Sequence, residues 1–223
     1  MPKAYFTPEV FQFLSQLKRN NKRDWFLKNK ERYEEVARQP CLRFITDLQF
    51  RMRDISPWIK VDPKPNGGSM MRIYRDIRFS RNKSPYKTNL GMHFSHAGSK
   101  EDIHGAGFYL HIAPGECFLA GGSWHPDRRS LAKIRDAIAW KSDEWKKATR
   151  NLELGGEVLR RPPRGYRGDH AMIEDLKRKD FIASVDFSER RVCSEKFMTE
   201  MLAGCRRLSP LTGFLCRAVG LGF

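Results

Sequence analysis

From Met70 to Gly122, short stretches of the chain alternate apolar and polar side chains, and this alternation constrains the fold more than any other feature. Leu90, Met92 and Phe94 alternate with Asn89, Gly91, His93 and Ser95. Phe108, Leu110 and Ile112 alternate in the same way with Gly107, Tyr109 and His111. A period of two is typical of a strand that buries one face. We therefore expect a sheet with one apolar face and one polar face.

Four strands are predicted, over Met70–Phe79, Asn89–His96, Gly107–Ala113 and Glu116–Gly122, with a further candidate at Phe181–Phe187. Their short connections, such as the turn at Pro114–Gly115, favour an antiparallel meander. Helical periodicity precedes and follows this region. The sequence thus predicts a single α+β domain over 1–223, in which N- and C-terminal helices pack on one face of the sheet. Residues 1–57 are expected to be helical, 68–123 to form antiparallel strands, and 127–223 to form helices with a small hairpin at Leu152–Leu159.

Composition excludes several classes of protein. The chain has 223 residues, 40% of them apolar, which is enough to bury a core, and a net charge of +16. No stretch approaches the ~20 apolar residues of a membrane span, and no apolar signal-peptide run follows Met1. We expect a cytoplasmic protein that does not bind a membrane. The five cysteines lack metal-site or disulfide spacing and are expected to be reduced core thiols.

The alternation of polar and apolar positions along the predicted strands brings ionisable side chains together. It collects Arg72, Asp76, Arg78, His93, Tyr109, His111 and Glu116 on one face. His111 or His93 could act as a general base, oriented by Asp76 or Glu116, with Tyr109 beside it. The competing interpretation is that each histidine satisfies a buried hydrogen bond.

The segment from Arg72 to Lys87 is strongly basic, with six cationic residues and one acid. Guanidinium and ammonium groups suit a phosphate or carboxylate ligand. The candidate ligand-binding residues of this loop are Arg72, Arg75, Arg78, Lys83, Tyr86 and Lys87. A solvated surface turn shaped by Pro85 is the alternative.

Two more candidates lie outside that loop. Trp124, after Gly121–Gly122, is a candidate stacking surface for a ligand, or else a core residue after a bulge. Arg164 lies in the rigid basic loop 160–168, which could fold over the polar face. No P-loop, dinucleotide-binding or nucleophile-elbow motif is present, and neither a metal nor a cofactor is predicted.

The chain resembles a widespread microbial and fungal family of uncharacterised proteins, a domain of unknown function. The resemblance rests on Arg72-Ile-Tyr-Arg-Asp-Ile-Arg-Phe-Ser80 with Lys83 and Pro85-Tyr-Lys-Thr88, and it continues through Gly107–His111 and Arg161–Tyr166 to Ile182. Ser123 and His125 depart from the residues that it leads one to expect around Trp124. The resemblance implies a soluble single-domain protein and carries no activity with it.

These observations support three hypotheses. The first is binding of a phosphate-bearing ligand, a nucleotide or nucleic acid, on the polar sheet face and its basic loops. The second is a hydrolase or transferase that acts on an anionic substrate in the same pocket. The third is a non-catalytic interaction module. Whether the chain is an enzyme, and its oligomeric state, are left open by the sequence.

Overall fold

Four antiparallel strands form the centre of the molecule. The computed structural model describes residues 4–98 and 105–223. The strands are β1 (Leu90–Ser95), β2 (Gly107–Ala113), β3 (Glu116–Ser123) and β4 (Phe181–Phe187), and they lie in the sheet in chain order. Three of the predicted strands, and the further candidate at Phe181–Phe187, are confirmed.

The two faces of the sheet differ as the alternation predicts. Met92 lies opposite Leu110, which lies opposite Leu119, and all three side chains are buried on the face that helices cover. His93 lies opposite Tyr109, and both are half-buried on the other face. We call this second face the open face of the sheet.

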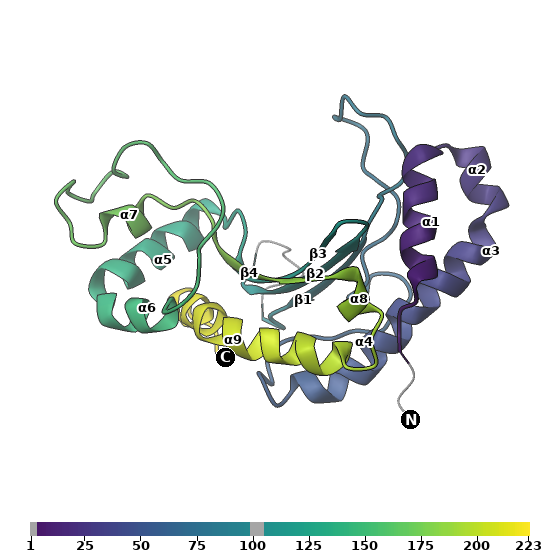
Figure 1. Cartoon of the computed structure of the whole chain (residues 1–223). Helices are drawn as coiled ribbons and strands as arrows, with labels where there is room; N and C mark the ends of the chain where they lie inside the picture. The colour runs from purple at the N-terminus through teal and green to yellow at the C-terminus, as the bar shows by residue number, and fades with distance from the viewer. Residues whose placement is uncertain (1–3, 99–104) are drawn as a thin grey trace.

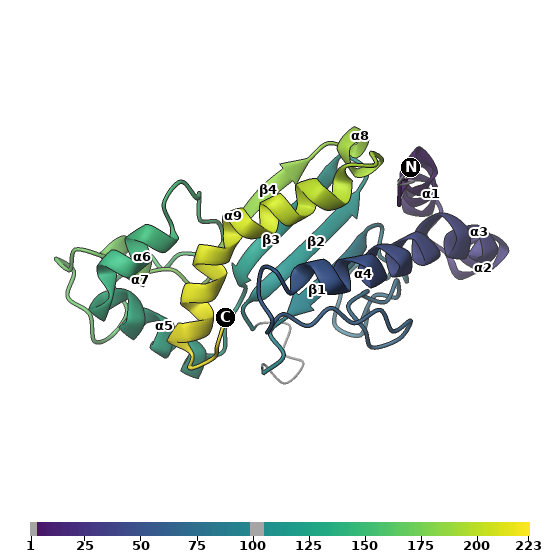
Figure 2. The ribbon, with the colours of Figure 1, turned by 90° about the horizontal axis from the view of Figure 1, so that it is seen from below.

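Helices α4 (Gln39–Met52) and α9 (Phe197–Ala218) cover the apolar face (Figures 1 and 2). The contact between α9 and β3 is close because glycines lie on both sides of it. A Cβ on Gly121 would lie 2.8 Å from the Leu208 Cβ, and one on Gly204 would lie 2.9 Å from Leu119. Phe44 of α4 stacks on Phe197 of α9, which joins the two helices. The result is a single α+β domain with N- and C-terminal helices on one face of the sheet.

The N-terminal helices form a lobe at one end of the sheet (Figure 1). They are α1 (Pro8–Arg19), α2 (Arg23–Lys28) and α3 (Lys30–Tyr33), followed by a π-helical turn at Glu34–Arg38 that runs into α4. Pro40 cannot donate a hydrogen bond, and its ring would crowd the preceding turn of a regular α-helix. The wider π turn directly before it lets the helix continue.

A second lobe lies at the opposite end of the sheet (Figure 1). It contains α5 (Arg128–Trp140), α6 (Ser142–Ala148) and α7 (Ile173–Leu176), while the short α8 (Glu189–Val192) connects β4 to α9. The Asp127 side chain caps α5 by accepting hydrogen bonds from the N–H groups of Arg129 and Ser130. No helix of the described residues is long and apolar enough to cross a membrane.

The predicted strand at Met70–Phe79 is wrong. Met71 donates a hydrogen bond to the Gly91 carbonyl, so the segment meets β1 for a few residues only. It then leaves the sheet and pairs with its own return, through Arg75 to the Pro85 carbonyl and Lys87 to the Ile73 carbonyl. Alternation of apolar and polar residues indicates an extended chain, but it does not show that the chain pairs with another strand.

The predicted hairpin at Leu152–Leu159 is also wrong. Its residues do not pair with one another; Gly155 forms a bridge to Ile182 and Val158 forms one to Arg178. Gly156 has a φ of +94°, a conformation that glycine tolerates, and the Glu157 N–H then reaches the buried carboxylate of Asp180. The segment therefore extends the edge of β4.

Candidate functional site

A pocket of about 350 Å³ lies on the open face of the sheet. Its floor comes from β2 and β3, and one wall comes from the segment that precedes β1. Its lining side chains include Met71, His93, Tyr109, Phe118, Trp124 and Ile182. Most of these are aromatic or apolar, so the pocket suits a flat organic group.

Tyr109, His111 and Asn89 form a polar cluster on the same face. The Tyr109 hydroxyl lies 3.0 Å from the His111 Nδ1, and the Asn89 amide nitrogen lies 3.4 Å from each of them. The amide nitrogen can only donate, so the His111 Nδ1 is best assigned as an acceptor, with its proton on Nε2. The imidazole is further held by stacking on Phe118, with ring centroids 4.9 Å apart and planes within 4°.

Burial sets the protonation states of this cluster. It lowers the pKa of His111, against an opposing effect of the Glu116 carboxylate, whose Oε2 lies 3.9 Å from the His111 Nε2. Burial also raises the pKa of Tyr109. At neutral pH the cluster therefore holds a neutral imidazole and a protonated phenol, a combination that can accept and donate a proton. The sequence-based grouping of Tyr109, His111, His93 and Glu116 on one face is confirmed by the strand register.

Asp76 and Arg78 do not join this cluster. They form an ion pair with each other at 2.6 Å in the exposed loop, and Arg78 lowers the pKa of Asp76 to about 2. The carboxylate that lies near His111 is that of Glu116. Asp76 and Arg78 were grouped with the sheet face because Met70–Phe79 was predicted to be a strand, and that prediction is wrong.

Other side chains of the basic segment stabilise the loop itself. The Lys83 ammonium donates to the Ile77 carbonyl, and Arg75 donates to Ser80 and to the Ser84 carbonyl. Tyr86 is buried and stacks on Phe26, with ring centroids 4.1 Å apart. The phenol therefore packs in the N-terminal lobe and does not face the pocket.

Arg72 and Lys87 are the cations of this segment that lie next in the chain to residues of the open face; neither lines the pocket, and Arg72 lines a different hollow against the N-terminal lobe. Arg72 follows Met71, which lines the pocket, and Lys87 lies two residues before Asn89. Among residues 4–98 and 105–223, neither forms an ion pair with a carboxylate. Lys87 is half-buried, and its pKa is lowered by burial and by the charge of Arg72. Two neighbouring cations favour an anion, although Arg72 also interacts with the charge of the Asp76 carboxylate.

Trp124 lies at the rim of the pocket and is 50% exposed, so the alternative that places it in the core is wrong. Gly122 makes this geometry possible: its φ is +126°, and a Cβ there would overlap the Phe181 carbonyl oxygen. The Trp124 ring packs on His125, with centroids 4.3 Å apart.

Sequence reasoning missed Asp180, which holds His125 in place. The carboxylate is 1% exposed and accepts hydrogen bonds from the N–H groups of His125 and Glu157, both at 2.7 Å. It also lies 2.9 Å from the His125 Nδ1. His125 itself has a φ of +49°, which is unusual for a residue with a side chain. His125 and Asp180 are 55 residues apart in the chain. The one signal in the sequence was that Asp180 is an acidic residue directly after the basic run 177–179 and directly before the strand at Phe181–Phe187.

Arg164 lies away from the sheet. It lines a separate hollow between α5 and its own loop, together with Trp140, Tyr166 and His170. The loop is held there by the Tyr166 hydroxyl, which donates to Asp136 at 2.7 Å. Within the described part of the chain, no group of three His, Cys, Asp or Glu residues is arranged to hold a metal ion.

Comparison with known proteins identifies a family, and the description of that family states no activity. No curated protein and no solved structure matches the sequence. A model of a family described as a conserved hypothetical protein, DUF2461, matches residues 9–214, which is nearly the whole chain and includes the open face, the basic loop and the Asp180–His125 pair. The chain therefore belongs to the DUF2461 family of conserved hypothetical proteins.

Proposed function

We propose that the open face of the sheet binds a small phosphate-bearing molecule of the nucleotide class. The observation that carries this proposal is a pocket lined by aromatic rings on a sheet face whose neighbouring segments carry two cations, Arg72 and Lys87, within electrostatic reach of each other. A nucleotide offers both of the groups that such a surface suits, a flat base and an anionic phosphate. A concave site of about 350 Å³ favours a small molecule over a polymer.

The cluster on β2 adds polar specificity to the pocket. The Tyr109 hydroxyl and the Asn89 amide are hydrogen-bonding groups that can turn toward a sugar or phosphate oxygen. Gly91 keeps the space above β1 available to them, since a Cβ there would lie 2.9 Å from the Tyr109 hydroxyl. Phosphate contacts are thus assigned to Arg72 and Lys87, and ring contacts to Phe118 and Trp124.

Isothermal titration calorimetry with ADP, adenosine and inorganic phosphate tests the proposal. ADP should bind more tightly than adenosine, and Lys87→Gln should weaken ADP roughly 10-fold or more, because a hydrogen bond to a charged group contributes ~1.5–3 kcal/mol. Lys83→Gln is the matched control, because its ammonium is engaged by the Ile77 carbonyl. Equal binding of ADP by wild type and by both Lys87→Gln and Arg72→Gln would refute the proposed site.

Hydrolysis or group transfer in the same pocket is a second candidate function. It is favoured by the contact of the Tyr109 hydroxyl with the His111 Nδ1, because a neutral imidazole can remove a proton from a phenol or from a bound water. Glu116, at 3.9 Å from the other ring nitrogen, would stabilise the imidazolium that forms.

Turnover of p-nitrophenyl phosphate tests this candidate. His111→Gln should abolish release of p-nitrophenol while ADP still binds, and His170→Gln, which changes a histidine in the distant α5–α7 lobe, should have no effect. Unchanged turnover in His111→Gln would exclude His111 as the base. Binding of ADP without any release of p-nitrophenol by the wild type would argue against hydrolysis of phosphate monoesters in this pocket.

A further inference from the structure

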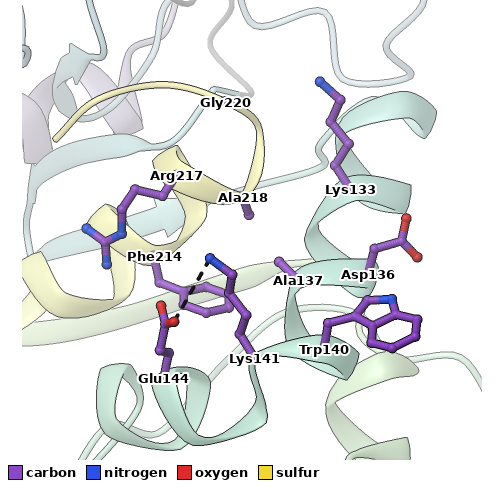
Figure 3. Close-up of a pocket in the computed structure, with 10 residues that line it drawn as sticks. All are labelled: Lys133, Asp136, Ala137, Trp140, Lys141, Glu144, Phe214, Arg217, Ala218 and Gly220. Carbon is purple, nitrogen blue, oxygen red and sulfur yellow. Dashed lines mark ion pairs between the residues drawn. The ribbon is translucent and has the colours of Figure 1, made fainter.

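Trp140, the last residue of α5, is 86% exposed. A hollow of about 420 Å³ lies on one side of it, between α5, α6 and the C-terminal part of α9, and a second hollow of about 590 Å³ lies on the other side, against the loop that carries Arg164. Both hollows are lined by Trp140 and Asp136. Figure 3 shows Trp140 and Lys133 projecting from α5, and Arg217 on α9 across the first hollow, with its guanidinium turned away from α5.

The charges around Trp140 are predominantly positive. Five basic residues (Lys133, Arg135, Lys141, Arg164 and Arg217) and two acidic ones (Asp136 and Glu144) line the two hollows. Glu144 pairs with Lys141 at 3.9 Å, and Asp136 keeps its charge while it accepts the hydrogen bond of the neutral Tyr166 hydroxyl. Within the described ranges, Arg217 and Arg164 form no ion pair with a carboxylate. The exposed indole therefore lies between Arg217 in one hollow and Arg164 in the other.

We propose that this surface binds single-stranded nucleic acid across Trp140. One base would stack on the indole, and the phosphates on its two sides would lie toward Arg217 and Lys133 in one hollow and Arg164 in the other. An aromatic ring between cations is the arrangement that binds single strands without sequence preference. A duplex buries its base faces and offers none to the indole.

An acidic peptide satisfies these observations less well. It would supply carboxylates for the arginines, but it has no general need for a flat, almost fully exposed indole between them. Bases, in contrast, provide a planar group at every residue of the polymer. This site is separate from the open face of the sheet, and the proposal does not depend on nucleotide binding there.

Fluorescence anisotropy with a labelled twelve-nucleotide oligothymidylate measures the binding. Trp140→Ala should weaken it about 5- to 150-fold, which corresponds to the loss of one stacked base. Trp140→Phe should restore part of the affinity. Arg164→Gln combined with Arg217→Gln should reduce the log–log salt slope by roughly 0.7 for each phosphate that the protein no longer neutralises.

Phe50→Ala is the matched control, because Phe50 is also an exposed aromatic, 68% accessible, with the Arg53 guanidinium 6.0 Å from its ring. It should bind the oligonucleotide as wild type does. Unchanged affinity in Trp140→Ala, or equal losses in Trp140→Ala and Phe50→Ala, would overturn the proposal. Displacement of the oligonucleotide by poly-glutamate at equal charge concentration would overturn it in favour of an acidic peptide.

Discussion

The absence of a side chain at Gly91 leaves room for the Tyr109 hydroxyl over β1. A Cβ at that position would also lie 3.0 Å from the Met71 sulfur. The glycine therefore leaves room both for Met71, which lines the pocket, and for Tyr109 of the polar cluster. The contact between Tyr109 and His111 arises because residues two apart on one strand point to the same face. The candidate site therefore depends on the absence of a Cβ at Gly91 as well as on the side chains of the polar cluster.

The titration of His111 tests the electrostatics of the cluster. Its folded-state pKa lies below the usual value of 6.5 because burial disfavours the imidazolium, and Glu116 opposes this effect. Glu116→Gln should therefore lower the pKa of His111 further, as measured by NMR titration of the imidazole resonances.

The same shift has a consequence for stability. The unfolded chain binds the His111 proton more readily than the folded one, so this residue's contribution to stability is present above the unfolded pKa and is lost as pH falls through the folded pKa. His111→Gln should flatten the loss of stability on going from pH 7 toward acid. A pKa of His111 above 6.5, or one that rises in Glu116→Gln, would contradict this account.

Asp180 supports a prediction about stability. Asp180→Asn replaces an acceptor oxygen with an amide that cannot satisfy both backbone donors, and a buried unsatisfied group costs ~1–3 kcal/mol. Urea unfolding should show a loss of this size. Asp169→Asn is the control, because Asp169 forms only an exposed pair with Arg167, and it should change stability by less than ~1 kcal/mol. Equal unfolding midpoints for wild type and Asp180→Asn would show that the buried carboxylate contributes nothing.

At the scale of elements, the contact between α9 and β3 organises the fold. Gly121 brings the strand close to Leu208, and α9 runs continuously from Phe197 to Ala218 although it contains Pro210. A serine followed by proline is typical of a helix start, but Ser209–Pro210 lies inside α9. The Ser209 hydroxyl donates to the Cys205 carbonyl instead of capping, and Figure 2 shows the helix bending along its length rather than ending.

A pair of glycine substitutions tests this contact. Gly121→Ala places a methyl group 2.8 Å from the Leu208 Cβ, close to the helix backbone, and should destabilise the protein by ~1–3 kcal/mol. Gly155→Ala is the control, because a Cβ there meets only Ile182, at 3.9 Å; it should be neutral or stabilising by up to ~1 kcal/mol. Denaturant unfolding compares the two, and a Gly121→Ala protein as stable as Gly155→Ala would contradict the close packing.

The strands show what alternation predicts and where it fails. Residues 90–95, 107–113 and 116–123 are strands within one residue of expectation, and alternation within β2 places Tyr109 and His111 on one face. Met70–Phe79 fails because its pairing is broken into isolated bridges, Met70 with Met92 and Tyr74 with Tyr86, and does not form a continuous ladder. The pairing of Asp180 with His125 was not predictable either, because it depends on how β3 and β4 meet and not on local pattern.

At the scale of the whole molecule, the two lobes lie at opposite ends of a sheet whose lower face is covered by α4 and α9 (Figure 1). Cations gather at two separate places, the basic loop beside the N-terminal lobe and the surface around Trp140 in the other lobe. We infer that these are separate sites for anions, a small ligand on the sheet and a polymer at α5.

Two-dimensional NMR of the isotope-labelled chain during titration with ADP tests the central claim most directly. The account predicts that shifted amide resonances gather at Lys87, Asn89, Tyr109 and Phe118 and at the residues around them on the open face. Shifts confined to α5 and residues 160–170, or no saturable shifts at all, would contradict it.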